Sequence, residues 1–309
     1  MIPGEFEYRR PSSKAEALTM LAAAGEGGRL LAGGHSLIPM MKLRMATPTT
    51  LVDLRRLDEL RSVTIGDTIT IGAAVTQHEI IVHDGLAEAC PILRETALLI
   101  ADPQVRYCGT LGGNVGNGDP GNDMPAVMQC LDADYVVESV GGTRIVRARE
   151  FYQGAYFTAL LPGEIISEIR IGRPTMGHGF AYTKLKRKVG DYATAAAAVV
   201  LEIAGGKVRS ASIALTNVAP TPLYATEAVA VIADTALDIE HINAAVRAAE
   251  AITDPSADGR GSAEYRRSMA GVMVRRALEK AKARAVEAGI APSNGGDGQK
   301  GGGVVGWLR

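Results

Sequence analysis

Two short segments contain the residue types that are best suited to bind an anion. Each pairs two glycines with a residue that carries a hydroxyl group. Glycine allows the backbone to approach a phosphate closely, and consecutive backbone N–H groups can point at it. The first segment is Ala32, Gly33, Gly34, His35 and Ser36, and the second is Thr110, Leu111, Gly112, Gly113 and Asn114. If both segments converge on one diphosphate, they form a site for a dinucleotide.

Neither segment matches the common nucleotide-binding motifs. The sequence has no G-x-G-x-x-G pattern after its first expected strand and no G-x-x-x-x-G-K-[ST] pattern. Two ordinary interpretations therefore stay open, since a glycine pair also marks a turn and Ser36 also fits the N-cap of a helix. In a phosphate site, Ser36 and Thr110 would each donate a hydroxyl hydrogen bond.

The sequence around the two segments resembles a known family. Residues 32–44 and 104–125 are similar to the FAD-binding medium subunits of molybdenum hydroxylases. Within that family, residues 184–198 and 265–276 most resemble the flavoproteins of aerobic carbon monoxide dehydrogenases. The resemblance extends from residue 1 to about residue 288, so that only the C-terminal tail lies outside it.

The resemblance implies further contacts with FAD. Asp123 follows Thr110 by thirteen residues, at the position of an FAD-binding aspartate. Ile100 and Ile166 correspond to apolar residues that enclose the adenine ring. Judged by residue type alone, Asp123 also fits an Asx turn or a helix cap, and both isoleucines fit an ordinary core.

Two more residues correspond to positions beside the flavin ring. Lys184 matches a basic residue of the flavin site, and Tyr192 matches a side chain that lies against the isoalloxazine. An aromatic side chain there can stack on the flavin and limit the access of solvent. The basic run around Lys184 also fits a solvated edge or a contact with another subunit.

Histidine and cysteine give little sign of a metal site. His35 has no second ligand at metal-binding spacing, and the resembled family holds its FAD non-covalently, so neither a metal nor a covalent flavin is expected. The three cysteines, Cys90, Cys108 and Cys130, are too few for a [2Fe–2S] cluster. We expect all three to be buried and reduced.

The composition excludes several classes of protein. With 309 residues, 47% of them hydrophobic, the chain can bury a substantial core. A net charge of −1 and 5% aromatic residues argue against a nucleic-acid partner. No apolar run reaches the roughly 18 residues of a membrane span, and no secretory signal opens the sequence. These features predict a cytoplasmic protein, with association at the inner face of the cytoplasmic membrane left open.

Periodicity and capping patterns predict an α+β fold. Capping boxes at Ser13 and Thr76 begin helices, and Gly66 lies in a hairpin between two short strands. A single helix is predicted from Leu86 to Ile100. In the C-terminal part we expect a three-stranded sheet of residues 180–184, 195–203 and 207–215, followed by helices at 225–233, 239–251 and 262–288.

The glycine- and proline-rich stretch 173–179 predicts a domain boundary. The resemblance implies an FAD-binding domain of the PCMH, or vanillyl-alcohol-oxidase-like, type over residues 1–177, with lobes of about 1–55 and 56–177. A flavoprotein C-terminal domain would follow over 178–288, and residues 289–309, which include Trp307, are expected to be a flexible tail.

The function implied by the resemblance is electron transfer through FAD. In the resembled enzyme, a large subunit with molybdenum cofactor and copper oxidises CO with water to CO2, and a small subunit carries two [2Fe–2S] clusters. The three chains would assemble as a dimer of heterotrimers that reduces a quinone-linked acceptor. The alternatives are a medium subunit for an aldehyde or N-heterocycle, a free-standing flavin oxidoreductase, and a non-enzymatic assembly subunit.

Overall fold

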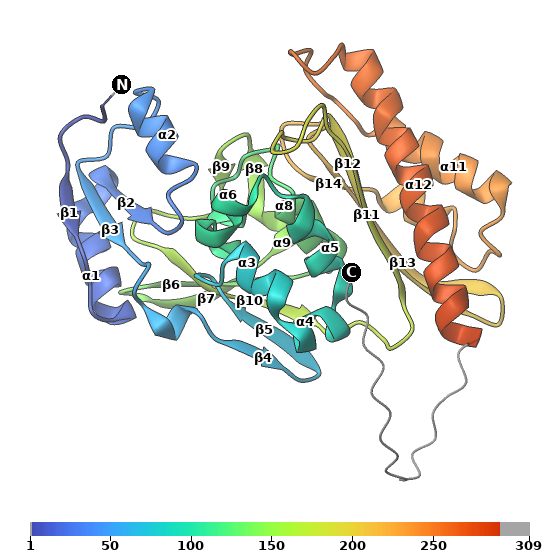
Figure 1. Ribbon diagram of the computed structural model, residues 1–309, viewed down its shortest axis with the longest axis horizontal. Coiled ribbons are helices and arrows are strands. Elements are labelled where there is room, and N and C mark those ends of the chain that lie inside the picture. Colours follow the sequence, from blue (N-terminus) through green and yellow to red (C-terminus); the bar gives the residue numbers. More distant parts are fainter. Residues whose placement is uncertain (1, 291–309) are drawn as a thin grey trace, which may run out of the picture.

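The computed structural model describes residues 2–290, which form three successive α/β layers (Figure 1). The first layer is a small parallel sheet in the order β1(Glu7–Arg9)-β3(Thr50–Asp53)-β2(Gly28–Leu31), packed against α1(Lys14–Ala24). The Ser13 side chain accepts a hydrogen bond from the backbone N–H of Glu16 at 3.2 Å, which confirms the predicted helix start. The first glycine segment connects β2 to α2(Leu37–Lys42).

The second layer is a sheet of five strands. Its central strand, β10(Ile165–Gly172), runs antiparallel to both of its neighbours, β5(Thr68–Gly72) and β6(Asp134–Ser139). The predicted hairpin around Gly66 is confirmed, and β6 forms a second hairpin with β7. The order of strands is β4(Val63–Ile65), β5(Thr68–Gly72), β10(Ile165–Gly172), β6(Asp134–Ser139) and β7(Gly142–Arg147).

The helix predicted from Leu86 to Ile100 is in fact two helices, α4(Asp84–Ala89) and α5(Pro91–Leu99). Proline disfavours helical backbone at the residue before it, and Cys90 accordingly has a ψ of 72°. Pro91 then occupies the first turn of α5, where the missing N–H is harmless. The other helices of this layer are α3(Gln77–Val82), α6(Pro103–Cys108), α7(Leu111–Gly116) and α8(Met124–Cys130).

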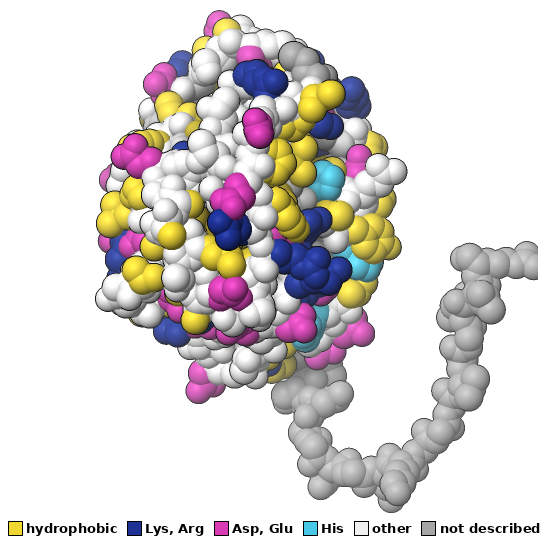
Figure 2. Space-filling view, turned by 90° about the vertical axis from the view of Figure 1, so that its left-hand side faces the viewer, with side chains coloured by type: hydrophobic (Ala, Val, Ile, Leu, Met, Phe, Trp, Pro, Cys, Tyr) yellow, Lys and Arg dark blue, Asp and Glu magenta, His cyan; other side chains and the backbone are white. Residues whose placement is uncertain are grey.

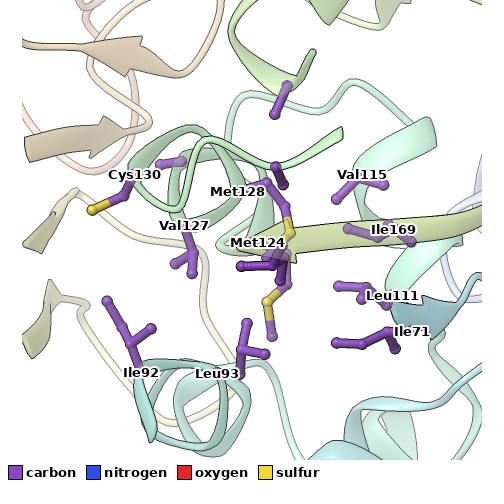
Figure 3. Packing of buried hydrophobic residues seen from close by; sticks show 14 of the residues in the cluster. Ile71, Ile92, Leu93, Leu111, Val115, Met124, Val127, Met128, Cys130 and Ile169 are labelled. Carbon is purple, nitrogen blue, oxygen red and sulfur yellow. The ribbon is translucent and has the colours of Figure 1, made fainter. Parts of the chain in front are cut away.

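The largest core surrounds α8 (Figure 3). Every residue of α8 is buried. Figure 3 shows Met124, Val127 and Met128 between side chains of α5, α7 and the five-stranded sheet. Because α7 and α8 both pack into this core, the segment between them, which contains Asp123, is anchored at both ends.

The third layer is the predicted sheet of three long strands, to which the structure adds a two-residue edge strand. The order is β11(Gly179–Leu185), β12(Ala195–Ala204), β13(Lys207–Thr216) and β14(Leu223–Tyr224). One face packs against α12(Ala263–Ile290), which in turn contacts α11(Ile239–Ala251), and the other face meets α5 and α8 (Figure 1). A Cβ atom on Gly179 would lie 3.0 Å from that of Ala285, so glycine permits this close approach of β11 and α12.

Several short elements were not predicted. They include β1, α6, η1(Gly25–Gly27), η2(Asp58–Leu60), α9(Ala148–Phe151), and the hairpin of β8(Tyr152–Gly154) and β9(Phe157–Thr158), whereas α10(Thr226–Ala230) confirms a predicted helix. The helix α12 continues through Ile290, two residues into the predicted tail. The remainder of that tail, with Trp307, lies outside the described residues.

Acidic and basic side chains are interspersed on the face that Figure 2 shows, in keeping with the net charge of −1. Within residues 2–290, none of the helices combines the length and the apolar character that a membrane crossing requires.

Candidate functional site

A single groove of about 1330 Å³ brings the predicted site residues together. It exceeds the roughly 300–1,000 Å³ of ordinary small-molecule pockets. Every predicted site residue lines it except Leu111, whose side chain is fully buried in the core around α8 (Figure 3). The residues that line it are Ala32, Gly33, Gly34, His35, Ser36, Ile100, Thr110, Gly112, Gly113, Asn114, Asp123, Ile166, Lys184 and Tyr192.

The two glycine segments touch each other at the floor of this groove. A Cβ atom on Gly33 would lie 2.7 Å from the Cα atom of Gly109 and would also overlap the carbonyl group of Cys108. A Cβ atom on Gly113 would lie 3.6 Å from that of Ala32. Glycine at position 33 is therefore required for the segments to meet, before any ligand is considered.

The first segment presents free backbone donors. Gly34 has a φ of +77°, a conformation that glycine adopts without strain. Among the described residues, the backbone N–H groups of Gly33, Gly34 and His35 donate to no protein acceptor. The hydroxyl group of Ser36 forms no capping hydrogen bond with α2. The geometry thus favours an anion site over the alternative that Ser36 serves only as a helix cap.

The second segment differs from the expectation, because the N–H groups of Leu111, Gly112 and Gly113 already donate to acceptors inside the protein. Leu111 and Gly112 donate to carbonyl oxygens of segment 73–75, both at 2.8 Å. Gly113 donates to the side-chain oxygen of Thr110 at 3.0 Å, which makes Thr110 the N-cap of α7. The hydroxyl hydrogen of Thr110 remains able to donate to a ligand. This segment can therefore provide side-chain groups and let a ligand approach the backbone closely, but it cannot provide a row of consecutive backbone N–H donors.

Asn114, at the end of the second segment, positions the residues around Asp123. Its backbone carbonyl accepts a hydrogen bond from the Asn122 side chain at 2.7 Å. Its side-chain oxygen accepts one from the backbone N–H of Met124 at 3.3 Å. Asp123 is thereby held between two tethered neighbours.

Asp123 and Lys184 form a buried ion pair with 2.8 Å between Oδ2 and Nζ. The other carboxylate oxygen accepts a hydrogen bond from the Tyr182 hydroxyl at 2.6 Å. Burial raises the pKa of Asp123, and the charge of Lys184 and the Tyr182 hydroxyl oppose that shift. Each carboxylate oxygen keeps a second acceptor position, so Asp123 can still accept from a ligand hydroxyl. Sequence patterns gave no sign of Tyr182 in this cluster.

The two predicted adenine-site residues lie on different elements. Ile100 is the C-cap of α5, and Ile166 precedes an irregularity in the pairing of β10 with β6. Both side chains are largely buried, at 6% and 5% exposure, yet both line the groove. The carbonyl oxygen of Leu99, beside Ile100, accepts a hydrogen bond from Lys184 at 3.3 Å, which connects this end of α5 to the ion pair.

Tyr192 lies on a loop between β11 and β12 that is tied at several points. Gly190 has a φ of +85°, and Arg187 pairs with Asp191 at 2.9 Å. The Tyr192 ring is packed so tightly on Gly121 that a Cβ atom there would lie 2.6 Å from Cδ1. The side chain is 42% exposed and lines the groove, so one side of the ring is available to a ligand.

Arg266, at the start of α12, anchors this loop and was not singled out in the sequence. Its guanidinium is buried and donates to the carbonyl oxygens of Thr194 at 3.2 Å and Ser256 at 2.7 Å. It also donates to the carbonyl of Asn217, whose side-chain amide donates in turn to the carbonyl of Ala193. The signal available in the sequence was the pair Arg266 and Arg267, which lies in the stretch 265–276 that carried part of the family resemblance.

Histidine and cysteine side chains form no metal centre in the part of the chain that the structure describes, since it contains no group of three or more candidate ligands. His35 is exposed at the edge of the groove. Cys90 and Cys130 are buried as expected, but Cys108 is exposed, because it lies at the end of α6 where the chain turns toward Gly33.

Comparisons with known proteins agree with this geometry. The model of the FAD binding domain in molybdopterin dehydrogenase matches residues 4–174, and that of the CO dehydrogenase flavoprotein C-terminal domain matches residues 180–281. The carbon monoxide dehydrogenase medium chain of Afipia carboxidovorans is 62% identical over 92% of this chain and 99% of its own length.

Solved structures of two enzymes superpose on nearly the whole described chain. A chain of reconstituted CO dehydrogenase from Oligotropha carboxidovorans has a TM-score of 0.91 at 62% identity, and 92% of this chain and 100% of that chain are covered. A chain of quinoline 2-oxidoreductase from Pseudomonas putida 86 has a TM-score of 0.88 at 33% identity, with coverage of 92% and 99%. The same fold therefore occurs in enzymes with different substrates.

Proposed function

Because the chain belongs to the family of FAD-binding chains of molybdopterin dehydrogenases, we propose that it is the medium chain of a carbon monoxide dehydrogenase. The observation that carries this proposal is the identity of 62% to a carbon monoxide dehydrogenase medium chain over almost the full length of both proteins. When bound, FAD supplies the redox chemistry, in which it receives electrons from iron–sulfur clusters and releases them to an acceptor.

The residues of the groove fit FAD. The free N–H groups of Gly33, Gly34 and His35 suit a diphosphate, and the hydroxyl groups of Ser36 and Thr110 add neutral donors. The apolar side chains of Ile100 and Ile166 suit an adenine ring. Asp123, Lys184 and Tyr192 suit the ribityl and isoalloxazine parts, while Asn114 positions Asp123. We assign Gly112 and Gly113 to close approach rather than to backbone donation.

The domain division that we propose follows the change of layer. Residues 1–177 would bind FAD in two lobes of about 1–55 and 56–177, and residues 178–288 would close over the flavin. The strands β10 and β11, which end and begin at Gly172 and Gly179, support this boundary. Tyr192 and Lys184 reach the groove from the C-terminal side of it.

In the proposed complex, this chain does not touch CO. A large subunit with molybdenum cofactor and copper would oxidise CO with water to CO2, two protons and two electrons, and a small subunit would carry [2Fe–2S] clusters. We propose a dimer of heterotrimers in the cytoplasm, with a quinone-linked acceptor. The groove of this chain, whose lining residues fit FAD, supports an electron-transfer role.

A second candidate function is that of a medium chain for another molybdenum hydroxylase. The similarity to a chain of quinoline 2-oxidoreductase favours it as the alternative, because that chain has nearly the same fold. The substrate would then be decided by the large subunit. Identity to the carbon monoxide dehydrogenase medium chain is nearly twice as high, at 62% against 33%, and favours CO.

The decisive experiment is purification of the native complex from its own cells through a tag on this chain. We expect FAD, molybdenum, copper and iron in the complex, and bleaching of the iron–sulfur and flavin absorption on addition of CO. A complex without copper that is bleached by an aldehyde or an N-heterocycle, and not by CO, would support the second candidate. A tagged chain that carries no flavin in any complex would contradict both.

We also propose that FAD is held non-covalently. Among the residues that line the groove, His35 is the only histidine, and it is exposed. The hydrogen-bond donors of the groove suit FAD without a covalent bond. Acid precipitation of the complex should release all of the flavin into the supernatant as FAD. A yellow, fluorescent protein pellet would show that the flavin is attached to the chain.

A further inference from the structure

Tyr156 has a backbone conformation that is unfavourable for its residue type. It lies in the turn between β8 and β9 and has a φ of +60°. In the left-handed region, the Cβ atom of any residue except glycine lies close to the following carbonyl group, and asparagine tolerates this conformation better than tyrosine. Glycine or asparagine would be more stable at this position of the turn. A tyrosine there suggests that its side chain has a function that offsets the backbone strain.

The surrounding backbone fixes this conformation. The N–H of Tyr156 donates to the carbonyl oxygen of Gly118 at 2.7 Å. Gly118 itself has a φ of +63°, and a Cβ atom on it would lie 3.3 Å from the carbonyl carbon of Tyr156. Gly118 follows α7 closely, so the turn is docked against the end of the second glycine segment. The position of the Tyr156 side chain is therefore set by the same backbone that shapes the groove.

The side chain lies at the same end of the groove as Tyr192. Tyr156 is 50% exposed and lines the groove. Partial burial and the neighbouring carboxylate of Asp119 raise the pKa of Tyr156 to about 12, and the positive charge of Arg260 opposes that shift. Burial and the same carboxylate raise the pKa of Tyr192. Arg260 lies over the Tyr192 ring, with 5.8 Å between its guanidinium carbon and the ring centroid. Both phenols thus share Asp119 and Arg260 as neighbours, and both stay neutral at physiological pH.

We propose that Tyr156 is a second aromatic contact for the isoalloxazine ring of FAD, which it holds together with Tyr192. The inference rests on the proposed function, because it requires FAD in the groove with its ring at the Tyr192 end. Asp119 lies beside both phenols. The unfavourable backbone conformation of Tyr156 is retained because it directs the ring at the ligand.

If Tyr156 contacts the flavin, its replacement should weaken FAD binding without loss of stability. In Tyr156→Gly and Tyr156→Asn, the new residue tolerates a positive φ, so the FAD-free chain should unfold at the same temperature as wild type or at a higher one. The same variants lose the aromatic contact, so their affinity for FAD should fall on the order of tenfold. Tyr156→Phe keeps the ring and should keep most of the affinity.

The test uses the assembled complex with the full variant chain, from which FAD has been removed and is added back. Quenching of flavin fluorescence gives the dissociation constant, and the flavin absorption bands report the environment of the ring. The matched control is Tyr107→Ala, since Tyr107 is 59% exposed but is not among the residues that line the groove. We expect changes in both readouts for the Gly and Asn variants and none for the control.

Two results would overturn the inference. In the first, the Gly and Asn variants bind FAD with wild-type affinity and absorption while Tyr192→Ala does not. In the second, both variants lower the unfolding temperature of the FAD-free chain, which would make Tyr156 a structural residue. Either result leaves the proposed function intact, because wild type still binds FAD. Failure of the wild-type complex to bind FAD would instead refute the proposed function itself.

Discussion

Gly33 and Gly34 serve different purposes although they are adjacent. Gly34 needs a positive φ, whereas Gly33 needs room, because a side chain there would overlap the backbone of Cys108 and Gly109. The contact between the two glycine segments therefore depends on the absence of a side chain at Gly33. Loss of flavin in a variant at this position would come from separation of the two segments.

Gly33→Ala should accordingly weaken FAD binding. We expect an affinity loss of at least about tenfold, which corresponds to about 1.4 kcal/mol, because the methyl group must push the segments apart. Gly66→Ala is the matched control, since a Cβ atom on Gly66 would make only an ordinary contact at 3.7 Å. Titration of the FAD-free complex with FAD measures both. Equal affinities in the two variants would show that the contact between the segments has no part in binding.

Removal of the hydroxyl group should have different effects on the stability of the chain at Ser36 and at Thr110, although both changes should weaken FAD binding. Thr110 caps α7, and Ser36 makes no capping bond. Thr110→Ala should reduce both FAD affinity and the free energy of unfolding, each by about 1 kcal/mol. Ser36→Ala should reduce the affinity by a similar amount and leave unfolding of the FAD-free chain unchanged. FAD titration and denaturant unfolding check the two effects, and a stability loss in Ser36→Ala would contradict the structural distinction.

The loop that carries Tyr192 illustrates how one element depends on another. Three carbonyl groups, of Thr194, Asn217 and Ser256, converge on the buried guanidinium of Arg266 in α12. None of these segments has regular structure of its own at that point. The first turn of a helix far along the chain therefore sets the position of the loop that we propose to lie at the flavin.

Arg266→Met should loosen this loop and change the environment of the flavin. Three carbonyl groups lose a charged donor, so we expect a free energy loss of at least about 2 kcal/mol and an altered flavin absorption spectrum. Arg276→Met, which replaces an exposed arginine of the same helix, is the control. Reoxidation of the reduced flavin, followed by rapid mixing, should change in the first variant alone. A destabilised Arg266→Met protein with a wild-type flavin spectrum would limit the role of Arg266 to stability.

The layers on either side of the groove are joined by Glu95. It lies on α5 and pairs with Lys280 at 3.1 Å and Arg284 at 2.7 Å, both on α12. It also accepts a hydrogen bond from the backbone N–H of Tyr182 at 2.7 Å. Burial raises the pKa of Glu95, but the hydrogen bonds from Arg284, the Tyr182 backbone and Lys280 outweigh it and hold the pKa below its ordinary value.

A lowered pKa in the folded state gives stability that is present above the unfolded pKa and is lost as pH falls through the folded pKa. Glu95→Gln should therefore cost roughly 1–2 kcal/mol near neutral pH, and its difference from wild type should shrink below about pH 4. Thermal unfolding between these pH values measures the difference. Glu88→Gln, an exposed carboxylate on α4, serves as the control. A cost for Glu95→Gln that does not depend on pH would mean that packing, and not the ion pairs, joins the layers.

Local patterns in the sequence were sufficient for many elements. Capping at Ser13 and Thr76, the hairpin around Gly66 and the three long C-terminal strands depend on residues a few positions apart, whose hydrogen bonds and side-chain spacing are encoded locally. The interruption between α4 and α5 could also have been predicted from the sequence, because Pro91 restricts the backbone of the residue before it. The groups that line the groove came from the family resemblance, which carries tertiary information that periodicity lacks.

The roles of individual groups depended on partners that are remote in the sequence. Leu111 resembles the other residues of its segment, but its side chain fills the core and its N–H group is taken by segment 73–75. Asp123 acquires its buried cation from Lys184, sixty-one residues later. No local pattern specifies which of several acceptors a backbone N–H will find, or which charge will be buried beside which. Those choices are made when the layers pack, since only then do the carbonyl groups, the cations and the apolar surfaces compete for the same space.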